Sequence, residues 1–150
     1  MTVVVTAAAG FLLAVLWFDL MFDVQVWRHR RAPDVPEPAL ESIAAYYRRV
    51  TTTASPMGRL VAVVMLVLIA ALVWQAVDGD APTGVSVASA PLALVAVGLA
   101  VGRVFGRARR LGARGDSPAV QTELARSIFR DHLICVSAMA TLLAVQLASS

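Results

Sequence analysis

The chain has no lysine, no asparagine and only one cysteine. One cysteine cannot form a bridge within the chain, so Cys135 has no disulfide partner there. No phosphate-binding loop, CxxC pair, HExxH motif or nucleophile elbow occurs, so none of these short motifs indicates an activity. All thirteen basic residues are arginines, and together with abundant alanine and valine this composition indicates a bacterium with a GC-rich genome.

Charged residues are also few. They make up 15% of the 150 residues, whereas 59% are hydrophobic and the mean hydropathy is +0.74. A soluble domain of this length would need far more polar surface, so we expect the lipid bilayer to surround most of the chain. The net charge of +3 does not indicate a nucleic-acid partner, because the arginines are sorted by loop rather than gathered on one face.

Four apolar segments are long enough to cross a hydrocarbon core about 30 Å thick. They cover about residues 3–22, 59–76, 88–106 and 128–148. The first lacks a basic leader and runs past any AAAG cleavage site, so we expect a retained helix rather than a signal peptide. The sequence predicts an all-α fold: an integral membrane four-helix bundle, up-down-up-down, as a single transmembrane domain over residues 1–150.

The arginines predict the orientation of this bundle. Six lie in the connection between the first and second segments, and seven lie between the third and fourth. The loop DGDAPTG, between the second and third segments, has two acids and no base. By the positive-inside rule, both arginine-rich connections are cytoplasmic and both termini lie outside. We therefore expect the protein in the cytoplasmic (inner) membrane of a bacterium.

Each arginine-rich connection also contains the start of a helix. In PEPALESIAAYYRRVTTTASP, Pro38 suits a first helical turn, and Pro56 ends or kinks the helix. In DSPAVQTELARSIFRDH, Ser117 suits an N-cap ahead of Pro118, and we expect this helix to continue into the fourth segment. The sequence thus predicts two amphipathic helical extensions on the cytoplasmic side.

Three glycines, Gly98, Gly102 and Gly106, recur every four residues in the third segment. This spacing is typical of a glycine zipper, a flat helix face that another helix approaches closely in lipid. We expect this face to pack inside the bundle. The alternative is a seam between two copies of the chain, which would make the protein a homo-oligomer.

The predicted topology brings ionisable residues together at the inner ends of the four segments. Polar groups at this depth are costly and usually face a partner or a cavity. The candidate binding layer comprises Asp19, Asp23, Tyr46, Tyr47, Arg48, Arg49, Arg130, Asp131 and His132, with Arg59, Arg103 and Arg107 at the same depth. We expect the outer half of the bundle to be nearly all aliphatic.

Three interpretations of this layer remain open. In the one we favour, Asp19 and Asp23 form ion pairs that hold the helices together. Arginine suits this role because its planar guanidinium binds a carboxylate through two hydrogen bonds. The arginines available for these pairs are Arg48, Arg49 and Arg130.

In a second interpretation, Asp19 and Asp23 share a metal ion with a third ligand. The candidates for that ligand are His132, His29 and Asp131. Helical bundles build such sites, but the Glu-x-x-His pattern of di-iron bundles is missing and nearby arginines repel a cation. The two histidines lie at similar depth, yet no haem attachment motif occurs, so we expect no cofactor.

In a third interpretation, the layer binds a lipophilic substrate or an anionic lipid. His132 and the two acids would carry protons. Tyr46 or Tyr47 would orient the substrate as hydrogen-bond donors. Arg48 and Arg49 would hold an anion or an enolate.

The blocks WFDLMFDVQV, SIAAYYRRVTTTASPM and LARSIFRDHLIC resemble a group of small bacterial four-helix membrane proteins with no assigned activity. In these blocks the resemblance rests on FDLMFD, AAYYRR and LARSIFRDH. A looser likeness, in size and helix number only, is to the anthrone-oxygenase-like membrane proteins. That likeness implies cofactor-free oxygen chemistry on polyketide-like substrates, but no motif matches residue for residue.

We therefore expect a non-catalytic integral membrane protein whose inner layer is structural or binds a partner protein or a lipid. The alternative is a small membrane enzyme or ligand-binding protein that acts on a lipophilic substrate. The residues assigned to that alternative are Asp19, Asp23, Tyr46, Arg48, Asp131 and His132. The sequence does not decide whether the protein is an enzyme.

Overall fold

The computed structural model describes residues 1–78 and 81–149. Its elements are α1 (Thr2–Arg28), α2 (Glu37–Thr51), α3 (Ser55–Asp78), α4 (Thr83–Leu99), the π-helix η1 (Ala100–Val104), α5 (Phe105–Ala113) and α6 (Pro118–Ala148). No strand occurs within the described ranges, and the all-α prediction is confirmed.

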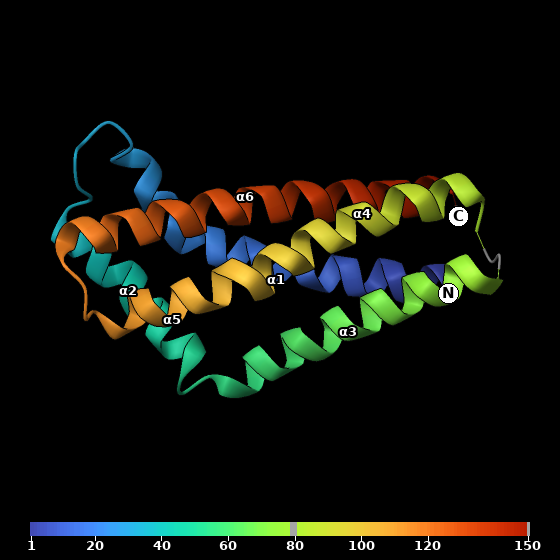
Figure 1. Cartoon of the computed structure of the whole chain (residues 1–150), viewed down its shortest axis with the longest axis horizontal. Coiled ribbons are helices and arrows are strands. Elements are labelled where there is room, and N and C mark those ends of the chain that lie inside the picture. The colour runs from blue at the N-terminus through green and yellow to red at the C-terminus, as the bar shows by residue number, and fades with distance from the viewer. Residues whose placement is uncertain (79–80, 150) are drawn as a thin grey trace.

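Within the described residues there are four long helices, which run side by side and alternate in direction (Figure 1). They are α1, α3, the continuous run Thr83–Ala113 and α6, and each is long and apolar enough to cross a membrane. The predicted up-down-up-down bundle is therefore confirmed, and its four apolar helices fit a membrane protein. Both termini lie at one end, the termini end, and we call the opposite end the arginine-rich end because all thirteen arginines lie in residues 28–59 and 103–130.

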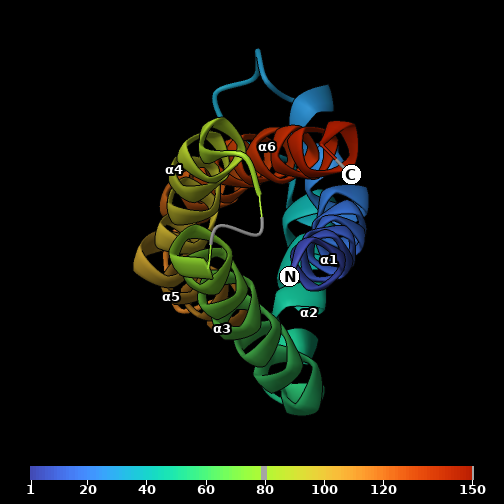
Figure 2. The same cartoon turned by 90° about the vertical axis from the view of Figure 1, so that its right-hand side faces the viewer.

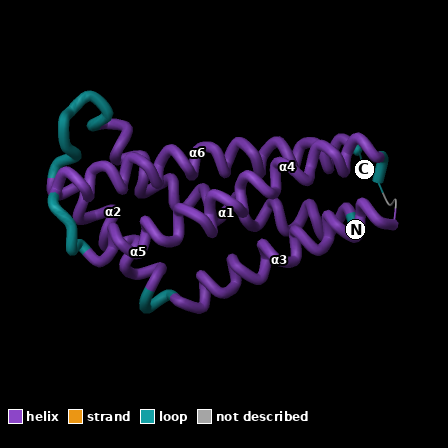
Figure 3. The backbone as a smooth tube through the Cα atoms, viewed as in Figure 1, coloured by secondary structure: helices purple, strands orange, loops and turns teal. Residues whose placement is uncertain are grey.

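Prolines mark the helix starts at the arginine-rich end. Pro38 lies in the first turn of α2, where its missing N–H costs nothing. The helix α2 ends at Thr51, and α3 starts again at Ser55. Pro118 follows Ser117 at the start of α6, which then runs unbroken for 31 residues. The short loops between these helices are drawn in teal in Figure 3.

The third long helix is longer than the predicted membrane segment. It continues past residue 106 through α5 and ends where Arg114 takes a left-handed backbone conformation, with φ of 55°. The end of the apolar segment marks the point where the chain is expected to leave the bilayer, but it does not mark the end of the helix. The helix continues because the next residues are rich in arginine and alanine, which both favour helix. The wider π-turn η1 interrupts the middle of this run.

The interior has two apolar parts. Along the bundle, α1 packs on α6 and α3, and α4 packs on α6. At the arginine-rich end, α2 packs on α5 and also contacts α6. Figure 2 looks along the bundle from the opposite end, which carries the termini. The buried α2 side chains Leu40 and Ile43 meet Leu111 and Ile128 at the arginine-rich end. This second part fixes α2 beside the inner ends of α1 and α6.

The glycine face of the third helix packs against no other helix of the described chain. Gly98, Gly102 and Gly106 are exposed, and a Cβ built on any of them has no neighbouring atom within 4 Å. The prediction of packing inside the bundle is therefore wrong. Among the glycines that the structure describes, the one that allows a close approach is Gly112, where a Cβ would lie 2.7 Å from the backbone nitrogen of Arg48.

The prediction of a nearly aliphatic outer half is also wrong, because the termini end holds a buried polar cluster. The amides of Gln75 and Gln146 exchange two hydrogen bonds, each of 3.2 Å. Gln146 also donates to Ser89 Oγ at 2.9 Å, and Gln75 donates to Thr2 Oγ1 at 3.1 Å. This amide cluster joins α3, α6, α4 and α1.

Candidate functional site

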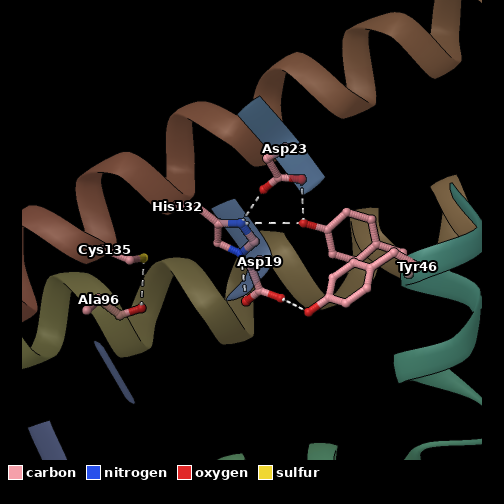
Figure 4. Close-up of polar contacts among 7 residues, drawn as sticks. Asp19, Asp23, Tyr46, Ala96, His132 and Cys135 are labelled. Carbon is pink, nitrogen blue, oxygen red and sulfur yellow. Dashed lines mark hydrogen bonds and ion pairs between the residues drawn. The ribbon is translucent and has the colours of Figure 1, made fainter. Parts of the chain in front are cut away.

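The centre of the candidate site is His132 on α6, which lies between two acids of α1 (Figure 4). Its Nδ1 is 2.6 Å from Oδ2 of Asp23, a short charge-assisted hydrogen bond. Its Nε2 is 3.8 Å from Oδ2 of Asp19. Asp19 and Asp23 lie one helical turn apart and therefore face the same side of α1. His132 and Asp23 are buried, and Asp19 is mostly buried.

Each of the two acids also accepts a hydrogen bond from a tyrosine of α2. Tyr46 donates to Oδ1 of Asp19 at 2.6 Å, and Tyr47 donates to Oδ1 of Asp23 at 2.7 Å. Burial, followed by the negative charge of Asp19, raises the pKa of Tyr46 well above its usual value. Burial and the Asp23 carboxylate do the same to the pKa of Tyr47. Both phenols therefore stay protonated at neutral pH and act as hydrogen-bond donors.

These contacts determine the hydrogen on one nitrogen of His132. Asp23 accepts the Tyr47 hydroxyl at Oδ1, and its Oδ2 lies 2.6 Å from Nδ1 of the ring. A carboxylate oxygen can accept a hydrogen bond but has no hydrogen to donate. His132 Nδ1 must therefore carry a hydrogen. The other nitrogen, Nε2, is too far from Asp19 Oδ2 for a direct hydrogen bond.

Asp131, the neighbour of His132, takes no part in this cluster. It is fully buried, and its Oδ2 lies 3.2 Å from Nε of Arg103 and 3.0 Å from Nη1 of Arg107. Arg107 also donates to the hydroxyl of Ser127. Adjacent residues of a helix point about 100° apart, which sends Asp131 toward α5 and His132 toward α1.

The prediction that Asp19 and Asp23 pair with arginines is wrong. Arg48 and Arg49 are exposed and make no ion pair with either acid in the part of the chain that the structure describes. Arg130 is exposed as well, and its nearest acid is Asp131, at 4.0 Å. The acids bind tyrosine and histidine instead, because α2 turns Tyr46 and Tyr47 toward α1 and the two following arginines away from it.

The geometry does not favour a metal ion at Asp19, Asp23 and His132. Within residues 1–78 and 81–149, no group of three or more His, Cys, Asp or Glu side chains is arranged to hold one. One oxygen of each acid already accepts a tyrosine hydroxyl, and Asp131 is bound to arginines. The expectation that the protein has no cofactor stays a prediction.

The cluster opens onto a cavity of about 630 Å³ between the helices. Asp19, Tyr46, Tyr47 and His132 line one wall of it, whereas Asp23 lies behind His132. Most of the remaining lining is aliphatic and comes from the four long helices; it includes Leu12, Val15, Leu16, Val61, Ala62, Met65, Ala96, Val97, Ala100 and Met139. A mostly apolar cavity with a few convergent polar groups is typical of small-molecule sites.

Cys135 also lines the cavity, one turn beyond His132. The thiol donates to the backbone carbonyl of Ala96 at 3.6 Å, between α6 and α4 (Figure 4). In this position it packs two helices together, as buried cysteines commonly do.

Three features of the site were missed in the sequence. Arg103 and Arg107 were placed at the right depth but were not assigned to Asp131. The ring of Phe22 stacks on Tyr46 with centroids 4.1 Å apart, and its place on α1 between the two acids is the signal that could have found it. The cavity itself depends on how the helices diverge, for which the sequence gives no signal.

Comparisons with protein-family models, with curated proteins and with solved structures give no match to this chain. The resemblances to small four-helix bacterial proteins and to anthrone-oxygenase-like proteins therefore stay predictions. The function has to be argued from the geometry of the site.

Proposed function

We propose that this protein is an inner-membrane protein of a bacterium that binds a lipophilic small molecule in the cavity between its four long helices. The arginine-rich end would face the cytoplasm, by the positive-inside rule. The observation that carries the proposal is the place of Asp19 and His132, which face an apolar cavity of about 630 Å³. This volume lies within the range of about 300–1,000 Å³ that is common for ligand sites.

The cluster has a closed part and an open part, and only the open part is available to a ligand. Asp23, Tyr47 and His132 Nδ1 satisfy one another and join α1, α2 and α6. That closed part serves the structural role that the sequence predicts. Asp19 and His132 Nε2 stand 3.8 Å apart on the cavity wall without a direct hydrogen bond. A purely structural pair of buried groups would gain by closing this gap.

The apolar walls favour a lipophilic ligand over a water-soluble one. The bundle surface is rich in exposed aliphatic side chains, such as Leu66 and Val77, which suit lipid contact. A lipophilic molecule in the bilayer is already concentrated around such helices.

A cavity-filling substitution tests the proposal. Ala62 and Ala70 are both exposed residues of α3, two turns apart, and Ala62 lines the cavity whereas Ala70 does not. We expect Ala62→Trp to abolish binding of a lipophilic molecule and Ala70→Trp to leave it unchanged. The two variants place the same side chain on the same helix and so control for the substitution itself.

The readout is native mass spectrometry of the full chain released gently from its own membrane. Wild type and Ala70→Trp should carry a lipophilic adduct that Ala62→Trp lacks. A lipid extract of the same membranes should raise the Tm of the delipidated wild type but not that of Ala62→Trp. Equal adducts in all three proteins, or no adduct and no shift in any of them, would contradict the proposal.

A further inference from the structure

We infer that the polar end of the ligand is a hydroxyl group, so that the cavity takes a lipophilic alcohol. This inference rests on the proposed function and specifies the class of ligand. The geometry behind it is the gap between His132 Nε2 and Asp19 Oδ2, which are 3.8 Å apart on the cavity wall. An oxygen on the cavity side can lie about 2.8 Å from both atoms at once, which is hydrogen-bond distance to each.

Asp19 Oδ2 needs a hydrogen-bond donor, whereas His132 Nε2 needs an acceptor. Asp19 already accepts from Tyr46 at Oδ1, so its Oδ2 needs a second donor. The His132 ring lies between the carboxylates of Asp19 and Asp23, and its charged form, with hydrogen on both nitrogens, pairs those buried charges. In that form Nε2 donates and needs an acceptor. A hydroxyl group both donates and accepts, and it satisfies both atoms.

Groups that only accept or only donate hydrogen bonds leave one of the two atoms unsatisfied. A ketone or an ether only accepts, so the carboxylate of Asp19 would stay without its second donor in a buried place. An ammonium group only donates, and it would meet the N–H of His132. A carboxylate or phosphate would place its negative charge against Asp19 and near Asp23.

Two arginines that line the same cavity are an alternative binding site for the polar end of the ligand. Arg59 and Arg109 also line it, and they would attract an anionic head group. Both side chains are exposed, so water screens their charge and each is free to move. Asp19 is held by Tyr46, and His132 is held by Asp23, so their positions are set before a ligand binds.

The test uses four probes with the same sixteen-carbon chain: hexadecanol, its methyl ether, hexadecylamine and hexadecanoic acid. Binding to the delipidated full chain in detergent is followed by the rise in Tm with probe concentration and by native mass spectrometry. We expect hexadecanol to bind about tenfold more tightly than each of the other three, which corresponds to the loss of one hydrogen bond.

Asp19→Asn sharpens the test. The amide can accept from Tyr46 through its oxygen and donate to the ligand through its nitrogen. We expect this variant to lose the preference for hexadecanol over the methyl ether, because an acceptor now suits the site. The matched control is Arg59→Gln, which should keep the order of the four probes.

The outcomes separate the inference from the proposed function. If hexadecanol binds no better than its ether, amine or acid in the wild type, the hydroxyl inference is overturned, whichever lipophile binds best. If the acid binds best and Arg59→Gln removes that advantage, the arginines hold the ligand, and the lipophilic cavity still stands. The wild-type series decides even where Asp19→Asn does not fold.

Discussion

The two ends of the bundle each hold a buried polar cluster, and the clusters differ in whether they are complete. At the termini end, Gln75 and Gln146 exchange hydrogen bonds, and Ser89 and Thr2 complete the group. At the arginine-rich end, Asp19 and His132 Nε2 stay 3.8 Å apart beside a cavity. Polar side chains that close on one another hold helices together, whereas a group that stays open beside an apolar space is suited to a ligand.

The largest effect should come from breaking the closed part of the charged cluster. Asp23→Ala removes the hydrogen-bond acceptor of both Tyr47 and His132, which are buried side chains. We expect a loss of about 3–5 kcal/mol in the free energy of unfolding, as for other broken buried ion pairs. Denaturant unfolding in detergent measures it, with the exposed Asp34→Ala as the matched control. A loss no larger than that of the control would show that this cluster does not hold the helices.

The amide cluster should cost less to break, because its groups are neutral. We expect Gln75→Leu and Gln146→Leu each to lower the free energy of unfolding by about 1 kcal/mol, the usual scale of such bonds between membrane helices. The double variant should lose less than the sum of the two, because it leaves neither amide facing an apolar partner. Unfolding of the three variants under one condition gives the coupling energy. Strict additivity would mean that the two glutamines do not act as a pair.

The smallest effect should come from a polar contact outside the bundle. Arg110 hydrogen-bonds both oxygens of Asp116, at 2.8 and 2.7 Å, and lowers the pKa of that carboxyl. Because the pKa is lower in the folded state, the contact stabilises the fold above about pH 4, the unfolded value. This stabilisation is lost as the pH falls through the folded pKa.

Both side chains of that contact are at the surface, so salt should weaken it. The measurement is Tm against pH for wild type and Asp116→Asn at low and high salt. The two curves should approach each other as the pH falls from about 4 through the folded pKa, below which the wild-type carboxyl is protonated in both states. A constant gap at every pH would show that the carboxylate charge does not contribute.

The lengths of the apolar segments predicted the four helices, and the distribution of arginines among the connections predicted their alternating directions. Both predictions were possible because they depend on the local composition of each segment. The spacing of Asp19 and Asp23 placed both acids on one helix face for the same reason. Their partners could not be predicted, since the choice between Tyr46 and Arg48 depends on how α2 is rotated. That rotation is set by packing of α2 against α5, where Gly112 allows the close approach.

Other features left no pattern to read. A run of glycines every four residues predicts a flat face but not what covers it, and Gly98, Gly102 and Gly106 face away from the rest of the chain. Gln75 and Gln146 are 71 residues apart and have no motif in common. The five residues of the π-turn η1 carry no local pattern that predicts a π-helix rather than an α-helix.

The residues of the cluster around His132 are also synthesised in a fixed order. During synthesis, α1 reaches the membrane first with Asp19 and Asp23, and Tyr47 follows Asp23 by 24 residues. His132 follows Asp23 by 109 residues, after three of the four long helices have been made. Of the side chains that contact these two acids in the folded protein, the tyrosines of α2 are therefore made well before His132. The short helix α2 thus carries the donors of this cluster that are synthesised first, and α6 adds His132 last.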